Sequence, residues 1–364
     1  MKVVLNDYIE KFSNDSDLID YCLSLFVDGE ENSLIFSHKT WVIDRAVLLP
    51  SNTTVIIDNC TIKQKDGTFD NIFRGNNLVF ADDECFPVEI KPLRNVKILG
   101  KGQAVLEGPD VNRKIFHPIL NEEQDMVGDF YGFRTHQISF TMISGCEISG
   151  LSIVKTRGWA MCFDVSNDIH ISNVHFDTNV KNGDGIDFRS GTHHCVVENV
   201  TGKTSDDSMA CTALARTEKL DKNSFPIGNA LYPSEPSCCV LDNRTEEERN
   251  IHDVVIRNID TCGKYHAIIC LAAKGCKIYN IRIEGVHEPK GEWRDATVRI
   301  YTGYGGGYTK GDLHDIHVKD VYATYADNAV YCNTEVENLV LENIQHEKEN
   351  QKIKLDFPEG VQIL

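Results

Sequence analysis

Short alternating runs of apolar and polar residues recur along the chain, and many share a four-residue template. The template is an apolar residue, any residue, then Asn, Gly or Asp, then a second apolar residue. Each copy sits in a run rich in β-branched residues and bounded by Gly, Asn, Asp and Ser, which is typical of a β-strand. The copies are Ile148–Leu151, Ile171–Val174, Val197–Val200, Ile256–Ile259, Ile283–Val286, Val318–Val321 and Leu341–Ile344.

The spacing of these copies predicts the architecture. Successive copies start 23, 26, 59, 27, 35 and 23 residues apart, with no helical pattern between them. A period in the low twenties built from short strands favours an all-β solenoid, and the frame of a leucine-rich repeat is absent. We therefore predict a right-handed parallel β-helix in which each coil contributes about three strands to three parallel sheets.

Interruptions of the rhythm divide the chain. We expect residues 1–92 to form an N-terminal cap and the first coils, including a helix with Ser16 as its N-cap, because solenoids need a cap over the terminal coil. Residues 93–364 then form the β-helix region of one continuous domain. The longest interval holds an insertion at 213–250, and such long loops are commonly functional lids or disordered. Residues 109–135 form a second excursion.

The composition and net charge limit the classes of partner that the protein can bind. Hydrophobic residues make up 41% and charged residues 25% of the chain, which is ordinary for a soluble globular protein. The net charge of −18 disfavours nucleic acid and anionic membranes, both of which are bound through Lys and Arg. The longest apolar stretch, Ala267–Ala273, is too short to cross a bilayer. We expect no nucleic-acid or membrane partner.

The cysteines bear on the compartment. There are 13, an odd number, with no CxxC pair, and the first residues lack an apolar core and a cleavage site typical of a secretory signal. This pattern favours reduced, buried thiols and a cytoplasmic location. No zinc spacing or cofactor motif is found, and the Gly-rich run at 302–308 lacks the Lys and Ser or Thr of a phosphate loop. We expect neither metal nor cofactor.

Three carboxylates form the main candidate site. Asp184 lies in a glycine-flanked turn, and Asp206 and Asp207 follow 22 and 23 residues later, which is one coil. Residues one coil apart lie about 4.8 Å apart across a sheet, so the three should gather on one outer face. Repulsion at that distance should raise one of their pKa values, as a general acid requires. Both residues of the pair reach the groove only if the chain turns or bulges there.

Four motifs in successive coils then resemble a known family. They are Asn182-Gly183-Asp184-Gly185, Ser205-Asp206-Asp207-Ser208, Tyr265-His266-Ala267 and Val298-Arg299-Ile300-Tyr301. In this order they are similar to the N-T-D-G, D-D, G-H-G and R-I-K signature of the polygalacturonases, glycoside hydrolase family 28. The resemblance covers roughly residues 93–345.

The resemblance implies an inverting hydrolase on a right-handed parallel β-helix. Asp206 would be the acid, while Asp184 and Asp207 would hold and deprotonate the attacking water. His266 would tune a catalytic carboxylate. Inversion usually places the two carboxyl groups about 6.5 to 9.5 Å apart. The residues implied to bind substrate are Asn182, Arg299 and Tyr301.

Two departures leave the sugar open. Gly183 replaces the Thr of the first motif, which the motif should tolerate, and Tyr301 replaces the Lys of the fourth. Losing that Lys removes one of two cations expected to recognise galacturonate and leaves a ring and one hydroxyl. We expect an exo-acting hydrolase of short pectin-related oligosaccharides, since polymers do not reach the cytoplasm.

Other readings stay open at this stage. A polysaccharide lyase on the same fold would use the Asp cluster to hold Ca²⁺. A non-catalytic carbohydrate-binding β-helix would keep the same scaffold. His266 would otherwise be a packed strand residue, and Arg299 would otherwise form a surface ion pair. Linkage and oligomeric state are not fixed by the sequence.

Overall fold

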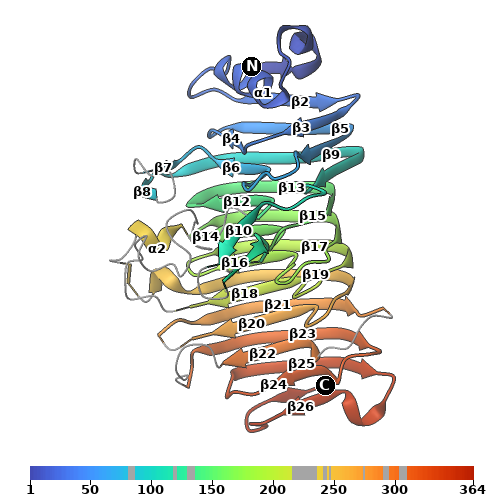
Figure 1. Ribbon diagram of the computed structural model, residues 1–364. Coiled ribbons are helices and arrows are strands. Elements are labelled where there is room, and N and C mark those ends of the chain that lie inside the picture. Colours follow the sequence, from blue (N-terminus) through green and yellow to red (C-terminus); the bar gives the residue numbers. More distant parts are fainter. Residues whose placement is uncertain are drawn as a thin grey trace.

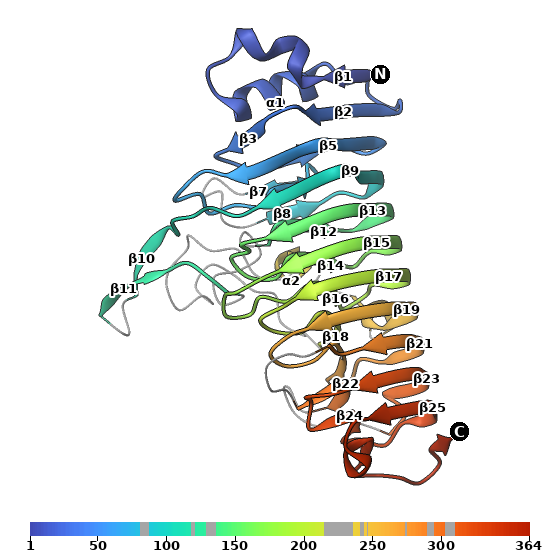
Figure 2. The ribbon, with the colours of Figure 1, turned by 90° about the vertical axis from the view of Figure 1, so that its right-hand side faces the viewer.

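Two long stacks of parallel strands run the length of the molecule, from the N-terminal coil to the C-terminal one (Figure 1). The computed structural model describes residues 1–80, 87–117, 121–128, 136–214, 236–240, 244–245, 247–273, 275–289, 295–302 and 310–364. Nearly every strand pairs in parallel with its counterpart one coil away, as Figure 2 shows from the side. The chain is therefore an all-β, right-handed parallel β-helix, as predicted.

The larger sheet has 13 strands within the described residues. They are β1 (Lys2–Val4), β2 (Asn32–Ser37), β3 (Thr40–Ile43), β5 (Thr53–Gln64), β9 (Leu93–Glu107), β13 (Ile143–Val154), β15 (Asn167–Asp177), β17 (His193–Lys203), β19 (Ile251–Cys262), β21 (Ile278–His287), β23 (Leu313–Ala323), β25 (Glu337–His346) and β27 (Gln362–Ile363).

The smaller sheet has ten shorter strands in the same part of the chain. They are β4 (Val47–Leu49), β6 (Phe73–Gly75), β12 (Ile138–Thr141), β14 (Met161–Asp164), β16 (Ile186–Arg189), β18 (Met209–Ala213), β20 (Ile268–Ala272), β22 (Ala296–Thr302), β24 (Asn328–Cys332) and β26 (Ile353–Leu355). Each coil thus runs along a long strand, turns, runs along a short strand and turns back.

The third residue of the repeated template marks a corner in the long strands. It has a left-handed backbone in every copy, with φ between 51° and 71° from Gly150 to Asn343. Gly, Asn and Asp tolerate this conformation best, which explains why the template admits only these residues. The pairing register skips the corner residue, for instance between Gly150 and Asn173. Each long strand therefore bends and covers two faces, so the expected third sheet is continuous with the first.

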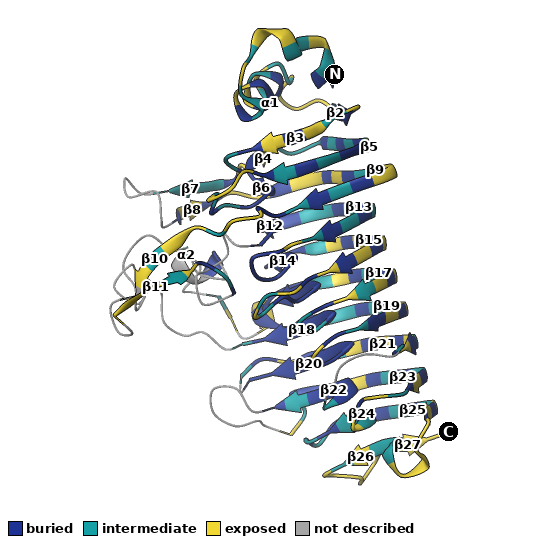
Figure 3. Ribbon diagram, turned by 45° about the vertical axis from the view of Figure 1, so that its right-hand side comes forward, coloured by how far each residue is buried: buried dark blue, intermediate teal, exposed yellow. Residues whose placement is uncertain are grey.

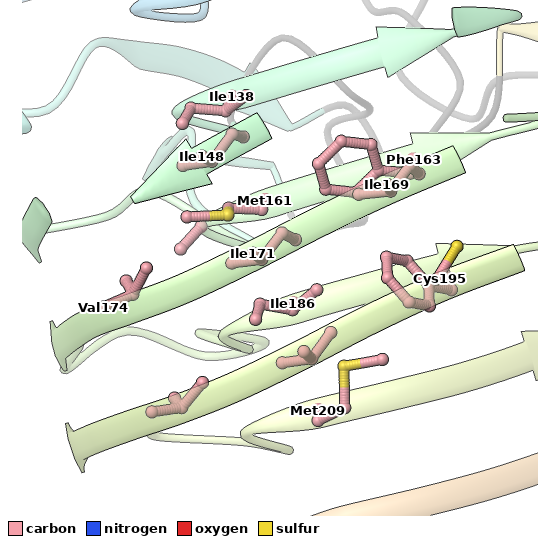
Figure 4. Close-up of a cluster of buried hydrophobic side chains, with 14 of the residues drawn as sticks. Ile138, Ile148, Met161, Phe163, Ile169, Ile171, Val174, Ile186, Cys195 and Met209 are labelled. Carbon is pink, nitrogen blue, oxygen red and sulfur yellow. The ribbon is translucent and has the colours of Figure 1, made fainter. Parts of the chain in front are cut away.

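Inward-facing apolar residues stack in columns to form the core. Ile148, Ile171 and Val197 follow one another in register on β13, β15 and β17, and each is fully buried. Figure 4 shows Ile148 and Ile171 of this column beside Met161 and Ile186 of the short strands. Burying one such side chain stabilises the fold by about 1.5–3 kcal/mol. Buried positions alternate with exposed ones along the long strands (Figure 3).

The N-terminal helix starts earlier than the sequence indicated. Helix α1 spans Asp15–Ser24, and its N-cap is Asn14 rather than Ser16. The Asn14 side chain accepts hydrogen bonds from the backbone N–H groups of Ser16 and Asp17, which satisfies two donors of the first turn. Ser16 is instead buried, and its hydroxyl accepts from the Asp44 N–H. A 3₁₀ helix at Leu5–Lys11 precedes α1.

Excursions leave the coils at a few points. The hairpins β7 (Leu78–Phe80) with β8 (Pro87–Ile90) and β10 (Lys114–His117) with β11 (Glu122–Asp125) are antiparallel, the second within the predicted excursion at 109–135. Of the predicted insertion at 213–250, the described part contains helix α2 (Ser237–Val240) and a 3₁₀ turn at Glu247–Arg249. Residues 215–235, 241–243 and 246 of that insertion, and residues 303–308 of the Gly-rich run, lie outside the described residues. A last 3₁₀ turn spans Glu349–Gln351.

No helix in the described ranges is long and apolar enough to span a membrane.

Candidate active site

The candidate catalytic residues, together with Asn182, lie in the turns that lead from a long strand to the next short strand. These turns, which end at Asp184, Asp207, His266 and Asp295, form what we call the carboxylate edge. Backbone hydrogen bonds connect them from coil to coil: Gly185 N–H donates to Asp207 O at 2.9 Å, and Ser208 N–H donates to His266 O at 3.0 Å. The ladder of the sheet thus continues into the turns and fixes their side chains in space.

The two glycines of the first motif are required by close packing between coils. A Cβ at Gly185 would overlap the carbonyl oxygen of Ser208 in the next coil. A Cβ at Gly183 would overlap the hydroxyl of Ser205, which donates to the Val180 carbonyl at 2.6 Å. The glycine that replaces the family's Thr therefore makes room for Ser205.

Three carboxylates come together as the coil spacing predicted. One oxygen of each of Asp184, Asp206 and Asp207 lies within 4.8 Å of the others. Asp206 and Asp207 precede β18 and lie in a bend, so strand alternation does not separate them. This spacing of the oxygens suits one water held by two carboxylates, since two hydrogen bonds span about 5.5 Å. The same spacing can also hold a cation.

His266 bridges two of the acidic groups. Its Nδ1 lies 2.6 Å from Oδ1 of Asp207, and its Nε2 lies 3.8 Å from Oδ2 of Asp295. Burial alone would lower the pKa of His266, but the charges of Asp207 and Asp295, together with the hydrogen bond to Asp207, outweigh it and raise the pKa to about 9. His266 is thus an imidazolium at neutral pH. It lies in a turn facing the cavity, not in a strand.

Asp295 was missed by the sequence reasoning. Its carboxylate lies 2.9 Å from Nε of Arg299, and the nearby positive charges of His266 and Arg299 lower the pKa of Asp295. The sequence does contain a pattern that could have indicated this ion pair, because Asp295 stands four residues before Arg299. The pattern is not specific, since an acidic residue four positions before an Arg is common on any protein surface.

Arg299 and Tyr301 extend along β22 beside this cluster. Arg299 is only 6% exposed, so the alternative of a surface ion pair does not describe it. Its guanidinium lies 3.6 Å from the ring centroid of Tyr331 and 4.9 Å from that of Tyr301, and Nη1 donates to Tyr331 O at 3.3 Å. Tyr301 packs against a small apolar cluster of Ala210, Ile269 and Leu271.

One cavity of about 700 Å³ unites these groups. The sequence-predicted residues that line it are Asn182, Asp206, Asp207, His266, Arg299 and Tyr301. Asp184 joins them through the carboxylate cluster. Lys181 and Lys264 lie at the cavity in exposed turns. The structure therefore brings every predicted site residue to one place, and this cavity is the candidate active site.

A second column of polar rings lies where the chain returns from short strands to long ones. His193, His252, Tyr279 and His314 occupy successive coils in register, with ring centroids 4.7–4.8 Å apart and interplanar angles of 3–7°. We call this column the ring ladder. Nitrogens of His193, His194 and His252 lie within 4.8 Å of one another, so these three can also hold a metal ion.

No family model and no curated protein sequence matches the chain. Among solved structures it is similar to a hyperthermoactive exopolygalacturonase from Thermotoga maritima (TM-score 0.54, 14% identity, covering 100% of this chain and 91% of that one). It is also similar to an endo-xylogalacturonan hydrolase from Aspergillus tubingensis (0.55, 14%, 96% and 88%). A third is an iota-carrageenase from A. fortis (0.58, 12%, 98% and 89%). At these identities the similarity shows a shared fold, the parallel β-helix that the motifs predicted.

Proposed function

We propose that this protein is an inverting glycoside hydrolase that acts on short pectin-related oligosaccharides and releases units from one end. The observation that carries the proposal is the grouping of Asp184, Asp206 and Asp207 in one cavity with a charged His266 bonded to Asp207. Three carboxylates allow one to act as the acid while two hold a water. The similar structures include an exopolygalacturonase, an endo-xylogalacturonan hydrolase and an iota-carrageenase, which supports the same class of reaction.

The roles follow from the local charges. His266 Nδ1 lies 2.6 Å from Oδ1 of Asp207 and holds that carboxylate in place, so we assign Asp207 the role of base and Asp206 that of acid. Asp206 then donates a proton to the glycosidic oxygen as the bond to the anomeric carbon breaks. A water held between Asp184 and Asp207 attacks that carbon from the opposite face and gives a proton to one of the two. The product has inverted anomeric configuration.

Release of units from the end of a sugar chain is supported by the way the cavity is bounded on its N-terminal side. Helix α2 lies there against β14, where the Ser237 N–H and hydroxyl both donate to the Asp164 carboxylate at 2.8 Å. All residues of β14 and β16 are buried, so the outer face of the short sheet is covered on this side. A cavity of about 700 Å³ is of a size that suits a few sugar units.

A cytoplasmic location is part of the proposal. Ten of the cysteines are free thiols, and all of these except Cys262 are buried. Cys211 and Cys270 stack in register inside the coils, where they pack as small apolar groups. Fractionation of the native host with an antibody to the protein tests this directly, and recovery in the medium would contradict it.

The experiment that tests the reaction is hydrolysis of short oligogalacturonides, rhamnogalacturonan fragments and neutral aryl glycosides by the wild type and by Asp206→Asn. Cleavage that is lost in the variant, with NMR showing the inverted anomer as first product, is expected. Retention of configuration would rule out the proposed mechanism.

A lyase is the second candidate, because the spacing of the three carboxylates also suits Ca²⁺. An unsaturated product absorbing in the ultraviolet, formed only without chelator, would favour it. Binding of a sugar by both proteins with no cleavage by either would favour a non-catalytic carbohydrate-binding protein.

A further inference from the structure

In the half of the cavity around Arg299, acidic side chains balance the positive charges, and this affects whether a charged or an uncharged sugar can bind. We infer that this half binds an uncharged sugar unit and selects against a uronate, with Asp295 as the residue that sets the preference. The inference rests on the proposed function only in taking the ligand to be a sugar. We call this half the Arg299 subsite, built from Asp295, Arg299, Tyr301 and Tyr331.

The positive charge of Arg299 is already matched. Its Nε is 2.9 Å from the Asp295 carboxylate, its face stacks on Tyr331, and one terminal nitrogen donates to the Tyr331 carbonyl. A uronate carboxylate would have to share or displace Asp295 to bind Arg299 in the two-bond geometry that makes this pairing strong. The guanidinium donors that remain suit sugar hydroxyls equally well.

The surrounding charges add to this effect. A uronate entering here would approach Asp206, Asp207 and Asp295, three carboxylates that line the same cavity. The charge of His266 is already balanced by Asp207, 2.6 Å from its Nδ1, and by Asp295, 3.8 Å from its Nε2. Like charges at such distances in a partly buried site are unfavourable. Among the described lining residues the other cations are Lys181 and Lys264, which lie exposed in the turns and not at the Arg299 subsite. Lys354 is not one of the lining residues, and its Nζ lies 3.9 Å from the ring centroid of Tyr331.

The floor of the subsite favours the carbon face of a neutral pyranose. Tyr301 and Leu214 pack on Ala210, Ile269 and Leu271, an apolar cluster on the outer side of the short strands. An aromatic ring above such a surface offers contact to sugar C–H groups, and Asp295 can accept hydrogen bonds from two hydroxyls. Apolar walls with a few aimed polar groups are the usual composition of a small-ligand site.

The test uses a matched pair of ligands, trigalacturonate and its fully methyl-esterified form, which differ in charge and not in sugar or linkage. Binding is measured by calorimetry on the Asp206→Asn protein, so the result does not depend on turnover. The esterified form is expected to bind at least tenfold more tightly. A preference for the acid, or binding of neither form, would overturn the inference.

Substitutions on the same background identify the residues responsible. Asp295→Asn should tighten binding of the acid about tenfold and leave binding of the ester within threefold, and Asp295→Asn with Tyr301→Lys should reverse the preference. Asp253→Asn, a carboxylate outside the cavity, is the matched control and should leave the ratio unchanged. If Asp295→Asn weakens binding of the acid and of the ester equally, Asp295 has a structural role and the inference is contradicted. The inference is also contradicted if Lys264→Gln is the variant that changes binding of the acid while Asp295→Asn does not. If the ratios hold but no wild-type hydrolysis is found, the proposed reaction fails and the inference stands.

Discussion

The carboxylate edge and the ring ladder are both columns of polar side chains that repeat once per coil, yet they differ in kind. In the ring ladder, His193, His252 and Tyr279 stack face to face in strict register, at the spacing of the strands themselves. At the carboxylate edge the side chains come from turns, differ in type, and line a cavity. Stacked rings attract each other, whereas neighbouring carboxylates repel each other and require a cation, a proton or a water between them. A polar side chain that repeats from coil to coil therefore indicates a structural column, whereas carboxylates that repeat from coil to coil indicate a functional site.

The two edges also respond to pH in opposite senses. At the carboxylate edge, Asp207 and Asp295 raise the pKa of His266 and favour its charged form. In the ring ladder, burial and then the neighbouring His252 and His194 lower the pKa of His193 and favour its neutral form. One imidazole is held charged by acids, and the other is kept neutral by burial among rings.

The largest expected difference is in kcat, when one Asp at each edge is replaced by Asn. Asp207→Asn should lower kcat by about 10²–10⁴-fold, because the water loses its base. Asp253→Asn, beside the ring ladder, should leave kcat within about twofold. Single-turnover rates with oligosaccharide hydrolysis measure both, and circular dichroism checks the fold. A similar loss in both variants would mean that the comparison reflects stability and not chemistry.

The next contrast is stability at high pH. Because the pKa of His266 is raised from 6.5 to about 9, its contribution is fully present below pH 6.5 and is lost as the pH rises through 9. The loss is on the order of 2–3 kcal/mol. Urea unfolding at pH 6 and pH 9.5 should show the wild type weakening by this much more than His266→Gln. Equal weakening of the two proteins would show that His266 is not charged in the folded state.

Much of this organisation could be read from the sequence, and the limits have physical causes. The template predicted the coils because its third residue must adopt a left-handed corner, as Asn173 and Asn258 do. The interval from Asp184 to Asp206 predicted the carboxylate cluster because one coil is one strand spacing. Asp295 was missed because an exposed-looking acid four residues before an Arg is common, and only the turn places it against His266.

Removing one ring from the ladder should have a smaller effect. Tyr279 stacks on both His252 and His314, so Tyr279→Ala should lower the free energy of unfolding by about 1–2 kcal/mol. Tyr279→Phe keeps the ring and is the control. Neither substitution should change kcat/KM, since the ladder is away from the cavity. A fall in kcat/KM with Phe would indicate that the ladder takes part in function.

The smallest effect concerns acid stability of the ladder. Since the pKa of His193 lies below its ordinary value, folding favours the neutral ring, and this contribution is present above pH 6.5 and is lost as the pH falls below it. The wild type should therefore lose more stability between pH 7 and pH 5 than His193→Gln does. His317→Gln, which removes an imidazole outside the ladder, should behave as the wild type over the same range. Thermal unfolding at the two pH values measures the difference, and an acid response that is unchanged in His193→Gln would show that ring stacking, without regard to charge, accounts for the ladder.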